Sequence, residues 1–180
     1  MSRRVLQLWL CLAACGFLSA QTSPAPPRED LEYQVKAAFL LNFTRFVEWP
    51  DGAFSGPASP FAICVIGKDP FGEILDDTLA GEAVNGRKFV VRRFLDAPPP
   101  RACHVAYLVS PAKDSAKLIQ DLGPAVLTVG EGEAFARDGG IIAFVLQDRR
   151  VRFDVNSAAA SACGLRLSSK LLNVARIVRK

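Results

Sequence analysis

Three nearly continuous runs of apolar residues constrain the fold of this chain more than any other feature. They are residues 61–67 (FAICVIG), 103–109 (CHVAYLV) and 141–147 (IIAFVLQ). A strand with one face in water alternates apolar and polar residues, whereas a strand buried on both faces does not. Helical patterns lie between the runs, and parallel strands need such crossovers. The chain is therefore expected to form a parallel sheet that helices cover on both faces.

The segments around these runs predict a single α/β domain with a largely parallel, Rossmann-like sheet. Asp69 and Pro70 suit the N-cap and first position of a helix that ends near Leu79. Asp148-Arg149-Arg150 separate the third run from another strand and predict a C-terminal β-hairpin, which adds antiparallel pairing at one edge. The other expected elements are helices over 31–47, 113–122 and 168–178, an outer strand over 88–94, a strand over 125–130 and a short helical turn over 131–137.

The first expected helix carries a wide aromatic stripe. Phe39, Phe43 and Phe46 recur on one face of residues 31–47. We expect this stripe to face the core, and a surface that docks a partner protein is the alternative. The last expected helix, 168–178, is also amphipathic and offers a second such face.

The first 20 residues have the parts of a secretion signal. Arg3 and Arg4 give a positive start, residues 5–18 are apolar, and a small residue, Ala20, precedes a polar segment. We expect cleavage near Ala20 and export to the periplasm. The apolar stretch is shorter than the roughly 20 residues that a membrane-spanning helix needs. A Pro-rich linker would then occupy 21–30, and the folded domain 31–180.

A second processing signal overlaps the first. Leu12-Ala13-Ala14-Cys15 is similar to a lipobox, in which the cysteine becomes the lipid-bearing first residue. The apolar run continues past Cys15, where a lipoprotein normally becomes polar. Ordinary cleavage is therefore the main prediction, and a lipoprotein that begins at Cys15 is the alternative.

The charge of the chain argues against nucleic-acid binding. The formal net charge of the whole sequence is +4. It falls to +2 when Arg3 and Arg4 leave with the signal segment. Most other basic residues are scattered, so they do not form the clustered basic face that nucleic acids require.

Two of the cysteines in the expected domain are candidates for a disulfide. Cys64 and Cys103 each fall in an apolar run, and neighbouring strands bring Cα atoms within disulfide range. Exported proteins also fold in an oxidising compartment. Two buried thiols that act as small apolar side chains are the alternative. Cys163 would remain unpaired.

The residues predict neither a catalytic set nor a bound metal or cofactor. His104 is the only histidine, and it lies in an apolar run, where we expect a structural role. No CxxC pair is present, so a metal site is not expected. The acidic pairs Asp76-Asp77 and Glu131/Glu133 lack the apolar neighbours that would shift a carboxyl pKa.

The ends of the expected strands suggest a small-ligand crevice. Ligands of parallel sheets usually bind beyond the carboxyl ends of the strands, and Lys68, Ser110 and Glu131 follow three of them. The segment GKDPFG at 67–72 lacks the spacing of a phosphate-binding loop. The signal for a ligand is therefore weak.

The chain as a whole resembles the YfiR family. The segments that carry the resemblance are 33–50 (YQVKAAFLLNFTRFVEWP), 63–72 (ICVIGKDPFG), 103–109 (CHVAYLV), 126–131 (VLTVGE), 135–156 (FARDGGIIAFVLQDRRVRFDVN) and 168–178 (SSKLLNVARIV). The resemblance implies a periplasmic protein that binds and represses the sensor domain of an inner-membrane diguanylate cyclase. It also implies that an OmpA-like outer-membrane lipoprotein sequesters the repressor.

Redox state matters in the family that the chain resembles. Cys64 and Cys103 fall at matching family positions, whereas only Cys163 lies where better-studied relatives carry a second pair.

A homodimer remains open as a further assembly. The alternative function is a periplasmic small-ligand module coupled to a kinase or transporter, and a hydrolase is a third reading that lacks a candidate base.

Overall fold

The computed structural model describes residues 28–99, 101–109 and 112–180. The predicted secretion signal, its cleavage near Ala20 and the Cys15 alternative lie outside the described residues. So do residues 21–27 of the predicted linker, whereas its last three residues, 28–30, belong to the first helix and the linker boundary is wrong there. Among the residues that are described, no helix is long and apolar enough to cross a membrane.

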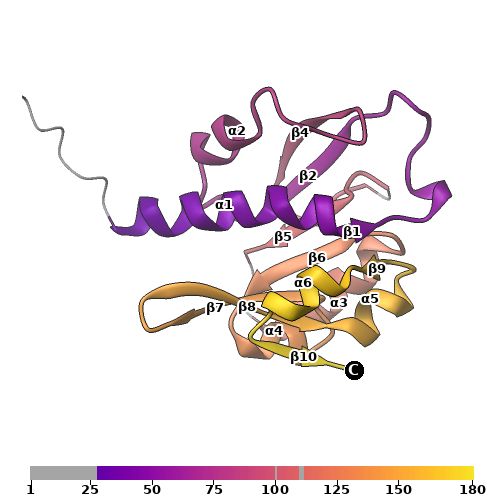
Figure 1. The fold of residues 1–180 in the computed structure, drawn as a ribbon. Coiled ribbons are helices and arrows are strands. Elements are labelled where there is room, and N and C mark those ends of the chain that lie inside the picture. Colours follow the sequence, from indigo (N-terminus) through magenta and orange to yellow (C-terminus); the bar gives the residue numbers. More distant parts are fainter. Residues whose placement is uncertain (1–27, 100, 110–111) are drawn as a thin grey trace, which may run out of the picture.

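In the described chain, eight strands form one sheet through the middle of the domain, in the order β10-β8-β7-β6-β5-β2-β4-β3 (Figure 1). Parallel pairing joins β4, β2, β5, β6 and β7 in turn, which confirms the expectation from the apolar runs. The strands are β2 (Phe61–Ile66), β3 (Ala83–Val84), β4 (Arg87–Phe94), β5 (Val105–Leu108), β6 (Leu127–Glu131), β7 (Ile142–Gln147), β8 (Arg150–Asn156) and β10 (Ile177–Arg179).

Helices cover both faces of this sheet, as predicted. One face carries α1 (Arg28–Phe46), α2 (Glu73–Leu79), α5 (Ser157–Ala162) and α6 (Ser169–Val174), and the other carries α3 (Ala112–Leu122) and α4 (Glu133–Arg137). The long α1 crosses one side of the sheet (Figure 1). After α1, β1 (Val47–Glu48) pairs antiparallel with β9 (Arg166–Leu167), and η1 (Asp51–Ala53) follows.

The predicted C-terminal hairpin is present. β7 and β8 pair antiparallel from Ile142 opposite Val155 to Gln147 opposite Arg150. The two turn residues, Asp148 and Arg149, have φ values of 49° and 61°. A two-residue hairpin turn needs such left-handed backbone, which matches the twist of the strands.

Two predicted helix boundaries are wrong. The helix predicted from Asp69 begins at Glu73, because Oδ1 of Asp69 accepts a hydrogen bond from the Phe71 N–H at 2.7 Å and forms a local turn instead. The helix predicted over 168–178 ends at Val174, and β10 follows it, parallel to β8.

The aromatic stripe of α1 faces the core. Phe43 is 1% exposed, and its ring packs on Phe144 and Phe153 at centroid distances of 5.8 and 5.1 Å. Phe39 packs on the same two rings. The core interpretation of this stripe is therefore confirmed, with Phe43 buried and Phe39 and Phe46 partly buried against the core.

Phe43→Ala should lower the free energy of unfolding by about 3–5 kcal/mol, because a buried ring is lost and a cavity remains. Chemical denaturation monitored by circular dichroism measures it. Leu31→Ala is the control on the same helix, since Leu31 is 53% exposed, and it should change stability by less than about 0.5 kcal/mol. Equal effects of the two substitutions would contradict this assignment of the helix faces.

Candidate functional site

Cys64 and Cys103 form a disulfide, with Cα atoms 5.7 Å apart. Cys64 lies in β2 and is fully buried, and Cys103 is 5% exposed. Cys103 lies in the bend before β5 begins at Val105, and not inside the strand as predicted. The alternative of two buried thiols does not hold in this structure.

Cys163 is a free, half-buried thiol at the end of α5. Burial raises its pKa, which lowers the thiolate fraction and therefore its reactivity near neutral pH. Cys163 and Cys103 line the same hollow of about 370 Å³. The Cys163 thiol therefore lies on the same hollow as the disulfide. The described residues contain no further cysteine with which it could form a second disulfide.

His104 has the structural role that its apolar surroundings predict. Its Nδ1 accepts a hydrogen bond from the Ala62 N–H at 3.0 Å, and its Nε2 lies 3.2 Å from the carbonyl oxygen of Ala53. Its ring stacks on Phe54 with the centroids 4.2 Å apart. Burial lowers the pKa of His104, so the neutral ring holds the loop that follows β1.

Of the three residues of the predicted crevice, the structure describes Lys68 and Glu131. Lys68 is exposed after β2, and Ser110 lies outside the described residues. Glu131 ends β6 and turns toward α1. Among the described residues, no hydrogen bond or ion pair joins Lys68 to Glu131, and the crevice stays a prediction.

Glu131 is instead the centre of a polar cluster that attaches α1 to the sheet. Lys36 is 3% exposed, and its Nζ lies 2.7 Å from Oε1 of Glu131 and 2.6 Å from Oε1 of Glu32. The buried Tyr107 on β5 donates a hydrogen bond to the same Glu131 oxygen. Tyr33 adds its hydroxyl at 3.4 Å, and its ring lies beneath the Lys36 ammonium.

Burial and hydrogen bonding have opposite effects on the pKa values of Lys36 and Glu131 in this cluster. Burial alone would lower the pKa of Lys36, but its bonds to Glu131 and Glu32 outweigh burial and raise it. Burial alone would raise the pKa of Glu131, but the bonds from Lys36 and Tyr107 outweigh burial and lower it. Burial, and then the charge of Glu131, raise the pKa of Tyr107. Lys36 and Glu131 are therefore both ionised at neutral pH, with Tyr107 as a neutral donor.

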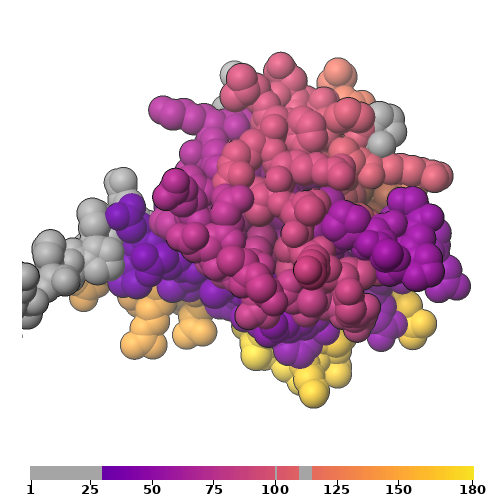
Figure 2. Space-filling model, turned by 90° about the horizontal axis from the view of Figure 1, so that it is seen from above, coloured from indigo at the N-terminus to yellow at the C-terminus, as the bar shows by residue number. Residues whose placement is uncertain are grey.

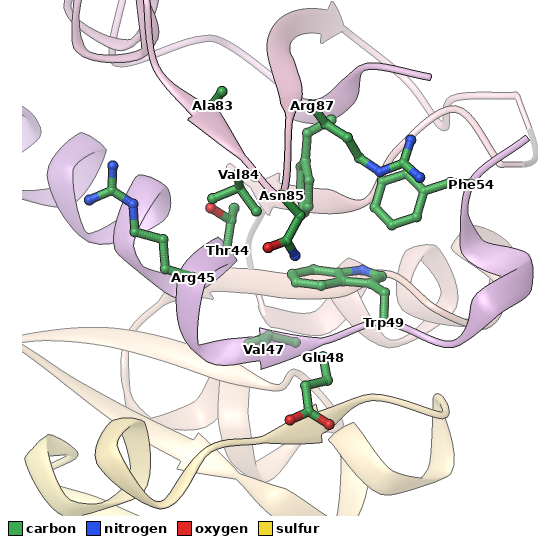
Figure 3. Close-up of a pocket in the computed structure, with 11 residues that line it drawn as sticks. Thr44, Arg45, Val47, Glu48, Trp49, Phe54, Ala83, Val84, Asn85 and Arg87 are labelled. Carbon is green, nitrogen blue, oxygen red and sulfur yellow. The ribbon is translucent and has the colours of Figure 1, made fainter. Parts of the chain in front are cut away.

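A groove of about 600 Å³ opens at the carboxyl end of α1, and we call it the Trp49 groove (Figure 3). It combines aromatic, aliphatic and hydrogen-bonding side chains from α1, β1, the following loop and the β3–β4 hairpin. Its lining residues are Thr44, Arg45, Val47, Glu48, Trp49, Phe54, Phe61, Ala83, Val84, Asn85 and Arg87. A volume of this size is typical of pockets for small ligands or for the side chains of a partner.

The walls of the Trp49 groove are held firmly. Trp49 meets Phe61 edge to face at 4.9 Å. The Arg87 guanidinium lies 3.9 Å from the ring centre of Phe54, a contact visible in Figure 3. Nη1 of Arg87 also donates to the carbonyl oxygens of Gly56 and Ser59, at 2.7 and 2.8 Å. The loop therefore keeps its place without a bound molecule.

One polar atom in the groove lacks a partner. The Nε1 of Trp49 is buried and has no hydrogen bond within the described chain. A buried donor without an acceptor costs roughly 1–3 kcal/mol. Figure 3 shows the Asn85 side chain next to the indole and Thr44 close by. The atom is closed to solvent, so an acceptor bound in the groove does not reach it in this conformation.

No local pattern in the sequence predicts this groove. Trp49 follows the first helical segment, and Asn85 precedes Gly86 in a turn. Asn85 has a φ of 51°, in the turn between β3 and β4. An aromatic residue just after a helix and an Asn-Gly turn can each be recognised in the sequence. No local sequence feature shows that the two lie next to each other in the fold.

The described residues contain no group of three His, Cys, Asp or Glu side chains that could hold a metal ion. Glu133, the other acid of its predicted pair, bonds to Arg176 at 2.7 Å. Asp76 forms an ion pair with Arg93. These carboxylates are therefore engaged in structural contacts.

The strand order and the helices on both faces define a single α/β domain with a mostly parallel central sheet. The model of the YfiR/HmsC-like family matches residues 33–176, and the chain belongs to this family. Its members are associated with the regulation of cyclic di-GMP signalling, as the sequence resemblance implies. No curated protein matches the sequence.

A solved structure supports the fold. It is described as a conserved domain protein from Vibrio cholerae O1 biovar El Tor strain N16961, and it shares 13% sequence identity with this chain at a TM-score of 0.53. The match covers 82% of this chain and 60% of that protein. The chain thus spans about three fifths of its length, and the likeness bears on fold alone.

Loss of the disulfide should destabilise the domain. Cys64→Ser combined with Cys103→Ser should lower the free energy of unfolding by about 2–5 kcal/mol, because the unfolded chain loses a covalent loop. Urea denaturation under non-reducing conditions measures the change. Cys163→Ser is the control, expected to change stability by less than about 1 kcal/mol. Identical unfolding of wild type with and without reductant would contradict a stabilising bond.

Glu131→Gln should destabilise the domain by about 1 kcal/mol at pH 7, since the Glu131 side chain is 44% exposed and solvent screens part of its ion pair. The pKa of Glu131 is lowered in the folded state, so its contribution is present above the unfolded pKa of about 4.3 and is lost as pH falls through the folded value. The stability difference between wild type and variant should therefore shrink in acid. Urea denaturation across a pH series measures it, and Glu133→Gln is the matched control.

Proposed function

We propose that this chain is a periplasmic regulator that binds the sensor domain of an inner-membrane diguanylate cyclase and represses the enzyme. Its presence would then lower cyclic di-GMP. The observation that carries the proposal is the match to the YfiR/HmsC-like family over residues 33–176. Family membership supports a regulator of this signalling system, and the cyclase as direct partner is the proposed addition.

We assign the partner to the Trp49 groove. Binding energy at protein interfaces concentrates where aromatic and arginine side chains form preformed pockets. The groove has Trp49 and Phe54 in its walls, and Arg87 holds the loop that follows Phe54. A partner side chain would enter the groove beside the indole ring of Trp49.

Export is the second part of the proposal. The sequence begins with a predicted secretion signal over residues 1–20, and the Cys64–Cys103 disulfide fits an oxidising compartment. In the periplasm, the domain could meet both an inner-membrane cyclase and an OmpA-like lipoprotein of the outer membrane. Sequestration by the lipoprotein would release the cyclase.

The proposed regulator acts without catalysis. In the described chain, His104 uses both ring nitrogens in contacts with backbone groups. Glu131 is neutralised by Lys36, and Glu133 by Arg176. General acid–base chemistry needs a titrating group within reach of a substrate, and these groups are already engaged.

A periplasmic small-ligand sensor is the second candidate. The volume of about 600 Å³ favours it. Trp49 is the only tryptophan in residues 21–180, so its fluorescence reports directly on the groove. A ligand that quenches or shifts this emission, with no effect of the protein on any cyclase, would favour this function.

Deletion of the gene in the native host should raise cyclic di-GMP, measured by mass spectrometry. The wild-type gene should restore the lower level. Trp49→Ala should restore it incompletely, because the aromatic wall of the groove is lost. Since truncation of an aromatic anchor at an interface costs about 2 kcal/mol or more, binding to the purified sensor domain should weaken by at least about 30-fold in calorimetry.

Lys117→Gln is the matched control, because Lys117 is 86% exposed on α3 and does not line the groove. It should restore the level fully. Unchanged cyclic di-GMP in the deletion strain would contradict repression. Full repression by the Trp49 variant would contradict the assignment of the groove.

A further inference from the structure

The loop between β1 and β2, residues 49–60, is attached to the sheet through the ring of His104. None of the loop residues is buried, and Figure 2 shows the loop in purple at the surface on the right. The His104 ring is only 8% exposed and packs against the loop. Its Nε2 lies 3.2 Å from the carbonyl oxygen of Ala53, and its face stacks on Phe54. The imidazole is therefore a contact between a surface loop and the interior.

The partners of this imidazole require one neutral form of the ring. Nδ1 lies 3.0 Å from the backbone nitrogen of the buried Ala62. A backbone N–H only donates, so Nδ1 must be the acceptor and must carry no proton. Nε2 then carries the proton and donates to the Ala53 carbonyl oxygen. An imidazolium has an N–H on both nitrogens and cannot accept the bond from Ala62.

The charges around the ring also oppose its protonation. Arg87 and Arg92 on β4 both place positive charge near His104, and they lower its pKa in addition to the larger effect of burial. The bond to the Ala53 carbonyl oxygen acts in the opposite direction and is outweighed. Within the described ranges, no ion pair joins the ring to a carboxylate. A proton on Nδ1 would therefore face a buried N–H donor and two guanidinium groups without a compensating anion.

The same ring supports the wall of the Trp49 groove. Phe54 lines the groove and contacts His104 on one side, with ring centroids 4.2 Å apart. Phe54 also meets Phe61 at 5.5 Å, and Phe61 meets Trp49 at 4.9 Å. Figure 3 shows the Phe54 ring under the Arg87 side chain, on the same side of the groove as the indole. A movement of the histidine would thus reach the groove through Phe54.

We propose that protonation of His104 turns its ring away from Ala62, detaches the first part of the 49–60 loop and opens the wall of the Trp49 groove. Arg87 does not titrate in this range, and it holds the carbonyl oxygens of Gly56 and Ser59 at 2.7 and 2.8 Å. The second part of the loop therefore stays in place. The loop would open at Ala53 and Phe54 and pivot near Gly56.

The direction of the pH dependence follows from the neutral state of the ring. The pKa of His104 is lowered from its usual value of 6.5 in the folded domain. The stability that the neutral ring contributes is therefore complete above pH 6.5 and is lost as pH falls through the folded value. The groove is closed at neutral pH and opens in acid. This switch is a property of the domain and does not depend on the proposed function.

Two unique residues make the switch measurable. His104 is the only histidine of the chain, and Trp49 is the only tryptophan in residues 21–180, which include the whole described domain. We would titrate this form from pH 8 to pH 5, above the range in which carboxylates usually protonate. The imidazole signal in NMR should titrate with a midpoint below 6.5. The emission of Trp49 should move to longer wavelength with the same midpoint.

His104→Asn separates protonation from other effects of acid. Its Oδ1 keeps an acceptor for the Ala62 N–H but cannot titrate, so the emission of Trp49 should not change between pH 8 and pH 5. His104→Gln, also neutral, is the second variant and should behave in the same way. Lys117→Gln is the control on the exposed face of α3, and it should retain the transition of the wild type.

Exchange of the Ala62 amide hydrogen supplies a measurement that needs no variant. After correction for the intrinsic effect of pH on exchange, its protection in the wild type should fall with the midpoint of the imidazole titration. Three results would overturn the proposal. The imidazole could remain neutral down to pH 5, or it could titrate while Trp49 emission and Ala62 protection stay constant. The third result is the same transition in both neutral variants.

Discussion

The ion pair between Lys36 and Glu131 determines where the first helix lies on the sheet. An ammonium that is 3% exposed must keep its anionic partners, because an unpaired buried charge is strongly destabilising. Glu131 is the last residue of β6, a central strand, so its ion pair with Lys36 fixes the distance between α1 and the sheet. The chain leaves α1 through β1, where Val47 pairs with Leu167. The position of Trp49 two residues later, and hence the groove, depends on this attachment.

Much of the fold could be predicted because burial on both faces leaves a local pattern. The run at 61–67 is continuous since β2 is a central strand, fully buried along its length. The hairpin was also local, because Asp148 and Arg149 take the backbone that a two-residue turn needs. The pairing of Cys64 with Cys103 followed from two such runs. In each case the pattern that predicts the structure lies in residues that are neighbours in the sequence.

The rest could not be predicted, because it depends on contacts between distant residues. Lys36 and Glu131 are 95 positions apart, and neither has a local signal for the other. The last helix was predicted too long since the bond from Arg176 to the fully buried Asp154, 22 residues earlier, favours an extended end that becomes β10. The Trp49 groove joins three separate segments. For the candidate site, the sequence showed which residue types are present, but it did not show that they lie close together in the fold.

The disulfide has a consequence for the integrity of the chain. Cys64 and Cys103 are 39 positions apart, and the segment between them contains α2, β3 and β4, which together form one flank of the domain. If that flank separates transiently from the sheet, the covalent bond limits the conformations it can reach and so speeds its return. Proteolysis is affected as well. A single cut at the exposed Gly81 would leave both halves of the protein joined through this bond, and the nicked domain could stay assembled.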